Sequence, residues 1–331
     1  MSQSFLPLLR DAVRDTRPEE PLAGHTTVRV GGPAAVMVFP SGGEELAAAL
    51  GALAGPARGA EWAVLGGGAN VFADSRGFDG VVISLSRWAW DFALEEGLLT
   101  VGGGVNMREV VVEAARRGWC GVDFMGVVPG TIGGAVCINA GTHSEGGFVA
   151  DRFLWAETLS PDGGKHRYEA ADMGFGYRSS RLLGGREIVT RAAFQLVRCE
   201  EIGKTPEGLI ETFEGWMAAR QRKFPMDLPN FGSTFRSPGA PHPPAGKLID
   251  ELGMKGLRVG GAQISERHGN FIVNLGGASS GDILALMRRM RDAVRERYGV
   301  TLRPEVRYLA NREERERERD LFLNDEMMNV E

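Results

Sequence analysis

The chain has 331 residues, about twice the length of a common domain, so we expect two or three packed units. Its 43% hydrophobic and 24% charged residues are ordinary for a globular protein and exclude a disordered, collagen-like or coiled-coil chain. A net charge of −5 excludes a global basic field that would attract nucleic acid, while a small anionic ligand stays open.

Cysteine and histidine usage argues against metal sites and disulfides. Cys120, Cys137 and Cys199 are widely spaced and form no Cys-x-x-Cys pair, and none of the five histidines belongs to a dense metal-ligand pattern. Residues 1–20 lack the order of a signal peptide, and no run of 18 apolar residues could span a membrane. We therefore expect a cytoplasmic protein without a metal, a nucleic-acid partner or membrane insertion.

The first third of the chain predicts alternating strands and helices. A helix is expected over 42–54, with Ser41 and Glu44 as a capping box, and a second helix that Asn106 caps and Gly118 ends. Short apolar runs bounded by Gly, Asp or Ser predict strands at 35–39, 62–65, 81–85 and 98–101. This pattern is typical of an α/β start.

The character of the chain changes at residue 126. Residues 126–147 contain seven glycines and so little side chain that we expect a long ordered loop rather than a helix. Mostly antiparallel strands are expected next, at 153–159, 164–168, 188–190 and 194–197.

The last third predicts a separate unit. Apolar periodicity predicts helices over 206–222, 245–252 and 280–298. Strands are expected at 271–274 and at 305–309, the second closing the last domain. The charged tail, 311–331, is expected as a solvated, salt-bridged helix or a disordered end.

The glycine excess gathers where a ligand could bind. Glycine is 47 of 331 residues, roughly double its usual share of about 7%. Gly66, Gly67 and Gly68 follow a predicted strand, and their backbone N–H groups can close on an anion because no Cβ intervenes. Neither a Walker nor a standard Rossmann pattern occurs, so a nucleotide would be held in another manner. Taken alone, the triple glycine could equally be a turn that ends a strand.

A second glycine-dense segment, 126–135, is followed by Asn139-Ala140-Gly141. Two such loops, roughly 60 residues apart in one α/β region, could line opposite sides of an extended ligand such as a dinucleotide. The pair is a stronger signal than either loop alone.

The order of these and later motifs points to a known family. The motifs run from residue 25 to 310 and occupy 26–32, 65–70, 129–135, 139–141, 176–180, 231–235, 245–250, 255–256, 260–262, 271–274 and 304–307. In this order the chain resembles the UDP-N-acetylenolpyruvoylglucosamine reductase family, flavin enzymes that complete UDP-N-acetylmuramic acid for bacterial peptidoglycan. The first 24 residues and the charged tail lie outside the resemblance.

The resemblance implies an α+β fold. A two-subdomain FAD-binding fold of the vanillyl-alcohol-oxidase (PCMH) type would be followed by a C-terminal α/β substrate-binding domain. The implied division is an N-terminal extension (1–24), the FAD-binding domain (25–203, with subdomains of about 25–90 and 91–203), the C-terminal domain (204–310) and the charged tail (311–331).

The resemblance also implies a reaction. NADPH would reduce non-covalent FAD, hydride would pass from flavin N5 to C3 of UDP-N-acetylglucosamine enolpyruvate, and Ser233 would protonate C2. Negative charge on C2 and its carboxylate needs preorganised stabilisation, a role that matches Arg178 and a partly protonated Glu305. Without the resemblance, these would read as a surface arginine, a turn serine and a strand-start carboxylate.

Further site residues follow from the same resemblance. Those expected at the cofactor are Gly66, Gly67, Gly68, Ala69, Asn70, Pro129, Gly130, Thr131, Gly133, Gly134, Asn139 and Gly141. Those expected at the substrate are Tyr177, Lys223, Ser237, Lys255, His268 and Arg307.

The chain departs from the family pattern at a few positions. Ser237 replaces a usual Asn, which questions contacts to the nucleotide part of the substrate and not the chemistry. Asn70 in place of a His or Cys after the triple glycine disfavours covalent flavin, although His25 and His143 stay open.

Two alternative functions compete with the reductase hypothesis. One is another FAD oxidoreductase of the same fold, acting on a sugar or hydroxy acid. An oxidase needs a base, so the joint presence of Arg178, Ser233 and Glu305 argues against it. The other is a catalytically silent nucleotide-binding protein, with the charged tail as its interaction element.

A monomer is the default expectation. The sequence leaves open the oligomeric state, the choice between NADPH and NADH, and loop closure during turnover.

Overall fold

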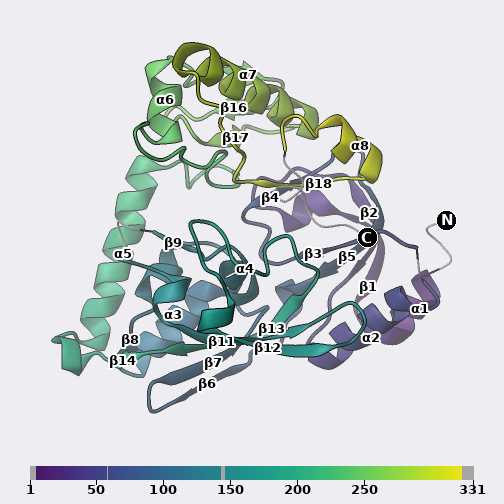
Figure 1. Ribbon diagram of the computed structural model, residues 1–331, viewed down its shortest axis with the longest axis vertical. Helices are drawn as coiled ribbons and strands as arrows, with labels where there is room; N and C mark the ends of the chain where they lie inside the picture. Colours follow the sequence, from purple (N-terminus) through teal and green to yellow (C-terminus); the bar gives the residue numbers. More distant parts are fainter. Residues whose placement is uncertain (1–4, 58, 143–145, 323–331) are drawn as a thin grey trace.

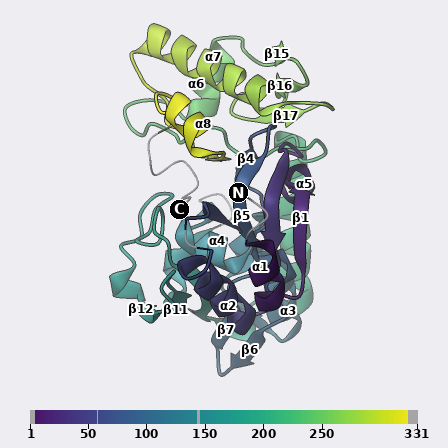
Figure 2. The ribbon, with the colours of Figure 1, turned by 90° about the vertical axis from the view of Figure 1, so that its right-hand side faces the viewer.

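The computed structural model describes residues 5–57, 59–142 and 146–322. Two subdomains form the lower part of the molecule and a C-terminal domain covers them from above, with the long helix α5 (Pro206–Lys223) running along one side between the two levels (Figure 1). Figure 2 shows the C-terminal helices as a separate upper layer. No helix among the described residues is both long enough and apolar enough to cross a membrane.

The first subdomain is built on a mixed sheet of order β1-β2-β5-β3. Its strands are β1 (Thr16–Pro21), β2 (Pro33–Val38), β3 (Trp62–Leu65) and β5 (Phe78–Ser84), and its helices are α1 (Leu6–Ala12) and α2 (Gly43–Ala54). β2 and β3 both run parallel to β5, which agrees with the predicted α/β start, and β1 is antiparallel to β2.

Residues before 25 are packed into this subdomain. Leu9 of α1 is fully buried together with Leu46 and Leu50 of α2. The two helices lie together beside the sheet (Figure 2). Helix α2 begins without the predicted Ser41–Glu44 capping box, because its N-cap is Gly42. Instead the amide and hydroxyl of Ser41 donate to Glu45, at 2.7 and 2.8 Å.

The second subdomain is built on an antiparallel sheet of order β12-β11-β13-β7-β6. Its larger elements are β6 (Phe92–Glu95), β7 (Leu98–Gly102), α3 (Met107–Arg116), β11 (Phe153–Leu159), β12 (Lys165–Glu169) and β13 (Ile188–Gln195). Two short pairs, β8 (Trp119–Cys120) with β14 (Val197–Arg198) and β9 (Gly141–Thr142) with β10 (Gly147–Phe148), flank it. The two strands predicted at 188–190 and 194–197 are largely one strand, since residues 191–195 continue the pairing with β7.

The glycine-rich segment is not the continuous loop that we predicted. It contains helix α4 (Ile132–Cys137), whose N-cap Thr131 accepts a hydrogen bond from the amide of Gly134 at 3.4 Å. Ile132 and Val136 are fully buried in the core of the second subdomain. Burial of these side chains and the cap outweigh the poor helix propensity of two glycines. Residues 143–145 of the segment lie outside the described residues.

Helix α5 bridges the two levels of the molecule. The division drawn from the sequence places it at the start of the C-terminal domain, but its buried side chains face the second subdomain. Leu209 packs with Cys120 and Cys199, and the ring of Phe213 lies against Gly126. After α5 the chain enters the C-terminal domain, with α6 (Ala245–Glu251), β15 (Arg258–Val259), β16 (Ala262–Ile264), β17 (Ile272–Asn274) and α7 (Ser280–Tyr298).

The last strand returns to the first subdomain. β18 (Arg307–Leu309) pairs in parallel with β4 (Val71–Ala73), so the prediction that it closes the last domain was wrong. The tail continues as α8 (Arg312–Arg317), an ion-paired helix as one alternative predicted. Phe322 is fully buried and stacks on Tyr308 with ring centroids 5.8 Å apart, so the tail is packed as far as residue 322.

Candidate active site

The two glycine loops lie directly against each other. A Cβ on Gly66 would be 2.7 Å from the hydroxyl oxygen of Thr131, and a Cβ on Gly67 would be 2.9 Å from Cα of Gly130. These distances are too short for a Cβ, so Gly66 can contact the Thr131 side chain and Gly67 the Gly130 backbone only because both positions are glycine. The structure thus brings together the two loops that the sequence placed on opposite sides of one ligand.

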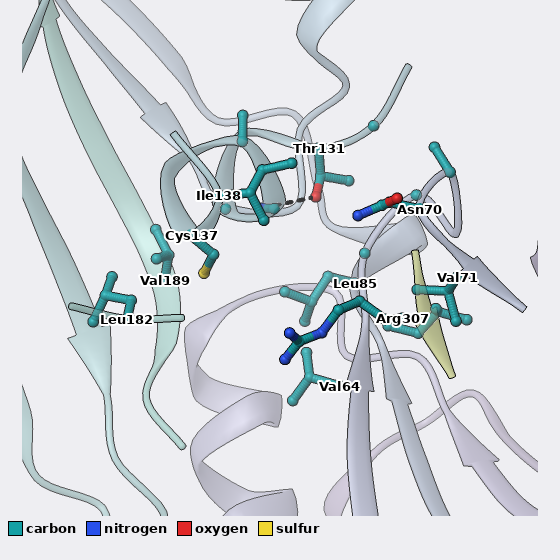
Figure 3. A pocket seen from close by; sticks show the side chains of 18 of the residues that line it. Val64, Asn70, Val71, Leu85, Thr131, Cys137, Ile138, Leu182, Val189 and Arg307 are labelled. Atoms are coloured by element: carbon teal, nitrogen blue, oxygen red, sulfur yellow. Dashed lines mark hydrogen bonds between the residues drawn. The ribbon is translucent and has the colours of Figure 1, made fainter. Parts of the chain in front are cut away.

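A cavity opens beside this contact, and we call it the glycine cavity. Its lining includes residues 64–71, 128–131, 133–135, 137–138, 140, 182–189 and 307. Apolar side chains including Val64, Leu85 and Val189 form its walls (Figure 3). Cys137 also lines it, and burial raises the pKa of this thiol to about 11 against the opposing effect of Arg307, so it stays protonated at neutral pH.

Arg307 belongs to the glycine cavity. We predicted it among the substrate residues, yet its side chain extends into the space between the loops (Figure 3). Its backbone amide donates to the carbonyl of Asn70 at 2.9 Å, and the side-chain amide of Asn70 donates to the carbonyl of Glu305 at 3.0 Å. The triple-glycine loop therefore holds the segment that carries both Glu305 and Arg307.

Arg178 and Glu305 form an ion pair. The Arg178 Nε donates to Glu305 Oε1 at 2.7 Å, and its Nη1 donates to the carbonyl of Gly141 at 3.0 Å. Both side chains are largely buried, with exposures of 22% and 13%. Two of the predicted catalytic residues thus meet beside the predicted cofactor segment, where partial burial strengthens their interaction.

Ser233 lies on the segment beside Glu305. The next residue, Thr234, accepts a hydrogen bond from the amide of Glu305 at 2.8 Å and donates its own amide to Asn270 at 2.8 Å. Phe235 and Pro304 continue this antiparallel contact. Backbone pairing therefore places the three predicted catalytic residues in one region.

Tyr177 and Ser237 meet across the boundary between the second subdomain and the C-terminal domain. Although Tyr177 is 52% exposed, partial desolvation of its hydroxyl and the nearby Glu305 carboxylate raise its pKa, while the backbone of Ser237 opposes this shift. Tyr177 therefore remains a phenol at neutral pH. The Tyr177 ring lies 5.4 Å from the Arg178 guanidinium.

Lys223, Lys255 and His268 form a second group, which we call the lysine–histidine cluster. Burial, followed by the charges of the two lysines, lowers the pKa of His268 to about 4, so its imidazole is neutral at neutral pH. The ring packs against Phe224 and Phe271, with centroids 5.0 and 5.1 Å away. Lys255 also pairs with Asp250 at 2.7 Å. Two cations beside a neutral hydrogen-bonding ring suit an anionic ligand.

Some predicted residues do not lie where expected. Asn139 and Gly141 are outside the lining of the glycine cavity and contact the Arg178 region instead. His25, which we left open for flavin attachment, has its Nε2 2.8 Å from Glu20, and His143 lies outside the described residues. Within residues 5–57, 59–142 and 146–322, no three His, Cys, Asp or Glu side chains are grouped to hold a metal.

Sequence reasoning missed the wall formed by residues 182–189. Residues 182–187 form the turn before strand β13, and neither this turn nor the start of an apolar strand matches a known binding motif. Gly103 offered an indirect signal, because a Cβ there would lie 1.9 Å from the carbonyl oxygen of Val189. The glycine at this position allows the wall to approach the cavity.

Comparison with known proteins first defines the class. Residues 34–168 match the model of an FAD binding domain. The glycine cavity fits such a cofactor, because glycine backbone, apolar side chains and the cation of Arg307 line it together. The chain is therefore a flavoprotein with the expected α+β, two-part architecture.

Closer relatives define the family. Residues 224–309 match the C-terminal domain of UDP-N-acetylenolpyruvoylglucosamine reductase. The reductase of Gloeobacter violaceus is 41% identical over 88% of this chain and 96% of its own length, and that of Heliobacterium modesticaldum is 38% identical over 88% and 90%. The crystal structure of the Thermus caldophilus reductase superposes with a TM-score of 0.71 at 36% identity, covering 89% of this chain and 98% of that one. The chain belongs to the UDP-N-acetylenolpyruvoylglucosamine reductase family, as the resemblance indicated.

Proposed function

We propose that this chain reduces the enolpyruvyl group of UDP-N-acetylglucosamine enolpyruvate to give UDP-N-acetylmuramate, with NADPH as reductant and non-covalent FAD as carrier. The observation that carries this proposal is the Arg178–Glu305 pair, held at 2.7 Å next to Gly141 and beside the segment of Ser233. Membership of the family supports the same reaction. We place the protein in the cytoplasm as a monomer, where it supplies a peptidoglycan precursor.

The glycine cavity would hold the flavin. Gly66, Gly67, Gly68 and Gly130 line the cavity without side chains that would obstruct a ligand, and the cation of Arg307 offers positive charge for the diphosphate. When bound, FAD supplies hydride at its N5 atom. The apolar walls would exclude water from the site of hydride transfer.

Arg178, held in place by Glu305, stabilises the charge that develops on the substrate. Hydride addition to C3 moves the electron pair of the double bond onto C2 and its carboxylate. The Arg178 guanidinium is fixed by Glu305 at Nε and by the Gly141 carbonyl at Nη1, so its plane is set before substrate binds. A preorganised planar cation of this kind stabilises the developing carbanion and needs little reorganisation.

Ser233 completes the reaction as proton donor. Its hydroxyl gives a proton to C2, so that the C=C double bond becomes CH3–CH and the serine oxygen recovers a proton from solvent. The lysine–histidine cluster would bind the UDP diphosphate through Lys223 and Lys255, with neutral His268 as a hydrogen-bond partner. Tyr177 and Ser237 would bind the sugar part, since the backbone of Ser237 acts on the Tyr177 hydroxyl and the Tyr177 ring lies 5.4 Å from the Arg178 guanidinium.

A stopped-flow experiment tests the proposal. Protein reduced anaerobically by NADPH is mixed with the enolpyruvyl substrate, and flavin absorbance reports reoxidation. Wild-type protein should reoxidise rapidly, while Ser233→Ala should be slower by about 10²–10⁴-fold, the range of general acid catalysis.

The controls distinguish the reductase hypothesis from its alternatives. Ser233→Ala should still be reduced by NADPH, because the first half-reaction needs no proton donor at C2. Reoxidation of Ser233→Ala at the wild-type rate would remove this residue from the mechanism. A wild-type flavin that oxygen reoxidises and the enolpyruvyl compound does not would favour an oxidase, and a protein that cannot be loaded with flavin would overturn the whole proposal.

A further inference from the structure

Asn139 follows helix α4 and is buried, with 7% of its surface exposed. Its side chain makes two hydrogen bonds to backbone groups of different segments. Nδ2 donates to the carbonyl of Gly176 at 3.0 Å, and Oδ1 accepts from the amide of Ala150 at 3.0 Å. The carboxamide is therefore committed to the protein itself, and it lies outside the lining of the glycine cavity.

Gly176 opens the tight turn that carries Arg178. Gly176 and Ser179 exchange backbone hydrogen bonds of 3.0 and 3.3 Å, and Arg178 between them has φ +52°. This left-handed conformation is unfavourable for a residue with a Cβ and persists only where surrounding contacts enforce it. The donation from Asn139 to Gly176 is one such contact, at the first residue of the turn.

A second contact from the same segment reaches the far end of Arg178. The Gly141 carbonyl, two residues beyond Asn139, accepts from the guanidinium Nη1 at 3.0 Å. Residues 139–141 therefore hold the Arg178 region at both its backbone and its side-chain end. Asn139 itself has φ +45°, a conformation that asparagine tolerates better than most residues.

We propose that Asn139 is a positioning residue for Arg178. By holding the turn at Gly176, it sets the guanidinium in the orientation that receives the carboxylate of the substrate. Few residue types fit this position, because it needs one donor, one acceptor and a left-handed backbone together. The inference rests on the reductase activity proposed above and assigns to Asn139 a role at the substrate in place of flavin binding.

Ligand binding to the flavin-loaded protein tests this inference. Asn139→Asp keeps the acceptor for Ala150 and loses the donor to Gly176, and Asn139→Gly tolerates the backbone conformation without adding a charge. Calorimetry would compare UDP-N-acetylmuramate, which carries the carboxylate, with UDP-N-acetylglucosamine, which does not. In both variants we expect binding of the first to weaken about tenfold and binding of the second to change less than about twofold.

Asn274 offers a matched control. Its Nδ2 donates to the Val28 carbonyl at 3.0 Å and its Oδ1 accepts from the Gly276 amide at 2.8 Å, so Asn274→Asp loses the same kind of bond. This variant should lower the thermal midpoint and leave the ratio of the two dissociation constants unchanged.

Two results would overturn the inference. One is equal weakening of both ligands in the Asn139 variants, which would indicate general loosening of the fold. The other is a reduced affinity for FAD, titrated separately, with the ratio of ligand affinities intact, which would return Asn139 to the cofactor. The reductase proposal fails on different evidence, namely a wild-type reduced flavin that the enolpyruvyl substrate does not reoxidise.

Discussion

The glycine cavity and the lysine–histidine cluster differ in the groups that form them, which are backbone and apolar side chains in the first and polar side chains in the second. At the cavity, the backbone of Gly67 meets that of Gly130 because Gly67 has no side chain, and apolar residues supply the walls. At the cluster, the binding groups are side chains, two lysines beside a neutral histidine. Substitutions should therefore act through steric exclusion at the cavity and through charge at the cluster, so the two regions should respond differently to salt and pH.

The largest expected effect breaks the backbone contact at the cavity. A Cβ in Gly67→Ala would lie 2.9 Å from Cα of Gly130, and a backbone atom cannot rotate away as a side chain can. We expect FAD affinity to fall at least about 100-fold, since the loops must separate. Fluorescence titration of the apoprotein with FAD measures this change.

Gly51→Ala is the matched control for this prediction. Gly51 lies in α2, is exposed, and has no atom within 4 Å of an added Cβ. The substitution should leave FAD binding intact and stabilise the protein by about 1 kcal/mol, because alanine favours a helix over glycine. Equal losses of FAD in both variants would refute the steric account.

A smaller effect should separate the cluster from the cavity. Lys255→Met removes a cation beside His268, so we expect the KM for the enolpyruvyl substrate to rise about tenfold while FAD affinity is unchanged. The dependence of KM on salt should also become weaker, because one charge pair fewer is screened. Steady-state kinetics at two salt concentrations measure both quantities.

Lys165→Met, on the exposed strand β12, is the control for the loss of a lysine. It should change neither the KM nor its dependence on salt. An unchanged KM in Lys255→Met would show that this lysine serves its ion pair with Asp250 and not the substrate.

The smallest expected effect is on stability as a function of pH. The pKa of His268 falls from 6.5 to about 4 on folding. Between pH 4 and 6.5 the unfolded chain binds a proton that the folded chain excludes, so the free energy of unfolding falls as pH decreases through this range. Below about pH 4 the contribution of His268 to this free energy no longer changes. His268→Gln should make the fall of the thermal midpoint across this range shallower.

Exposed His242 provides the comparison for this prediction. His242→Gln should keep the wild-type dependence on pH. If both variants match the wild type, the neutral state of His268 contributes nothing measurable to stability.

The sequence predicted the cavity better than the catalytic pair. The glycine loops were visible because an excess of one residue type is a local signal, and strand β3 before the first loop follows from a short apolar run. Arg178 and Glu305 lie 127 residues apart, so no local pattern joins them, and only the family resemblance identified both. Asn139 was assigned to the cofactor through the family resemblance, while the direction of its side chain depends on the tertiary fold.

The errors in the fold have the same origin. Helix α4 forms in a glycine-rich segment because Ile132 and Val136 are buried, and burial is decided by partners distant in the sequence. Strand β18 looked like the end of a domain because it is the last strand-like run before the charged tail. Its partner is β4, more than two hundred residues earlier. The sequence of a strand does not show which other strand it pairs with.

The return of β18 to β4 limits how the C-terminal domain can move. The chain passes between this domain and the rest of the molecule at two places, after α5 on one side and at β18 on the other (Figure 1). Val28, Val30 and Phe72 of the first subdomain also pack in the hydrophobic core of the domain, so a rotation that opens it would expose this shared core to water. That rotation must break the hydrogen bonds from Thr27 to Asn230 at 2.6 Å and from Asn274 to Val28 at 3.0 Å, which lie between the two bodies.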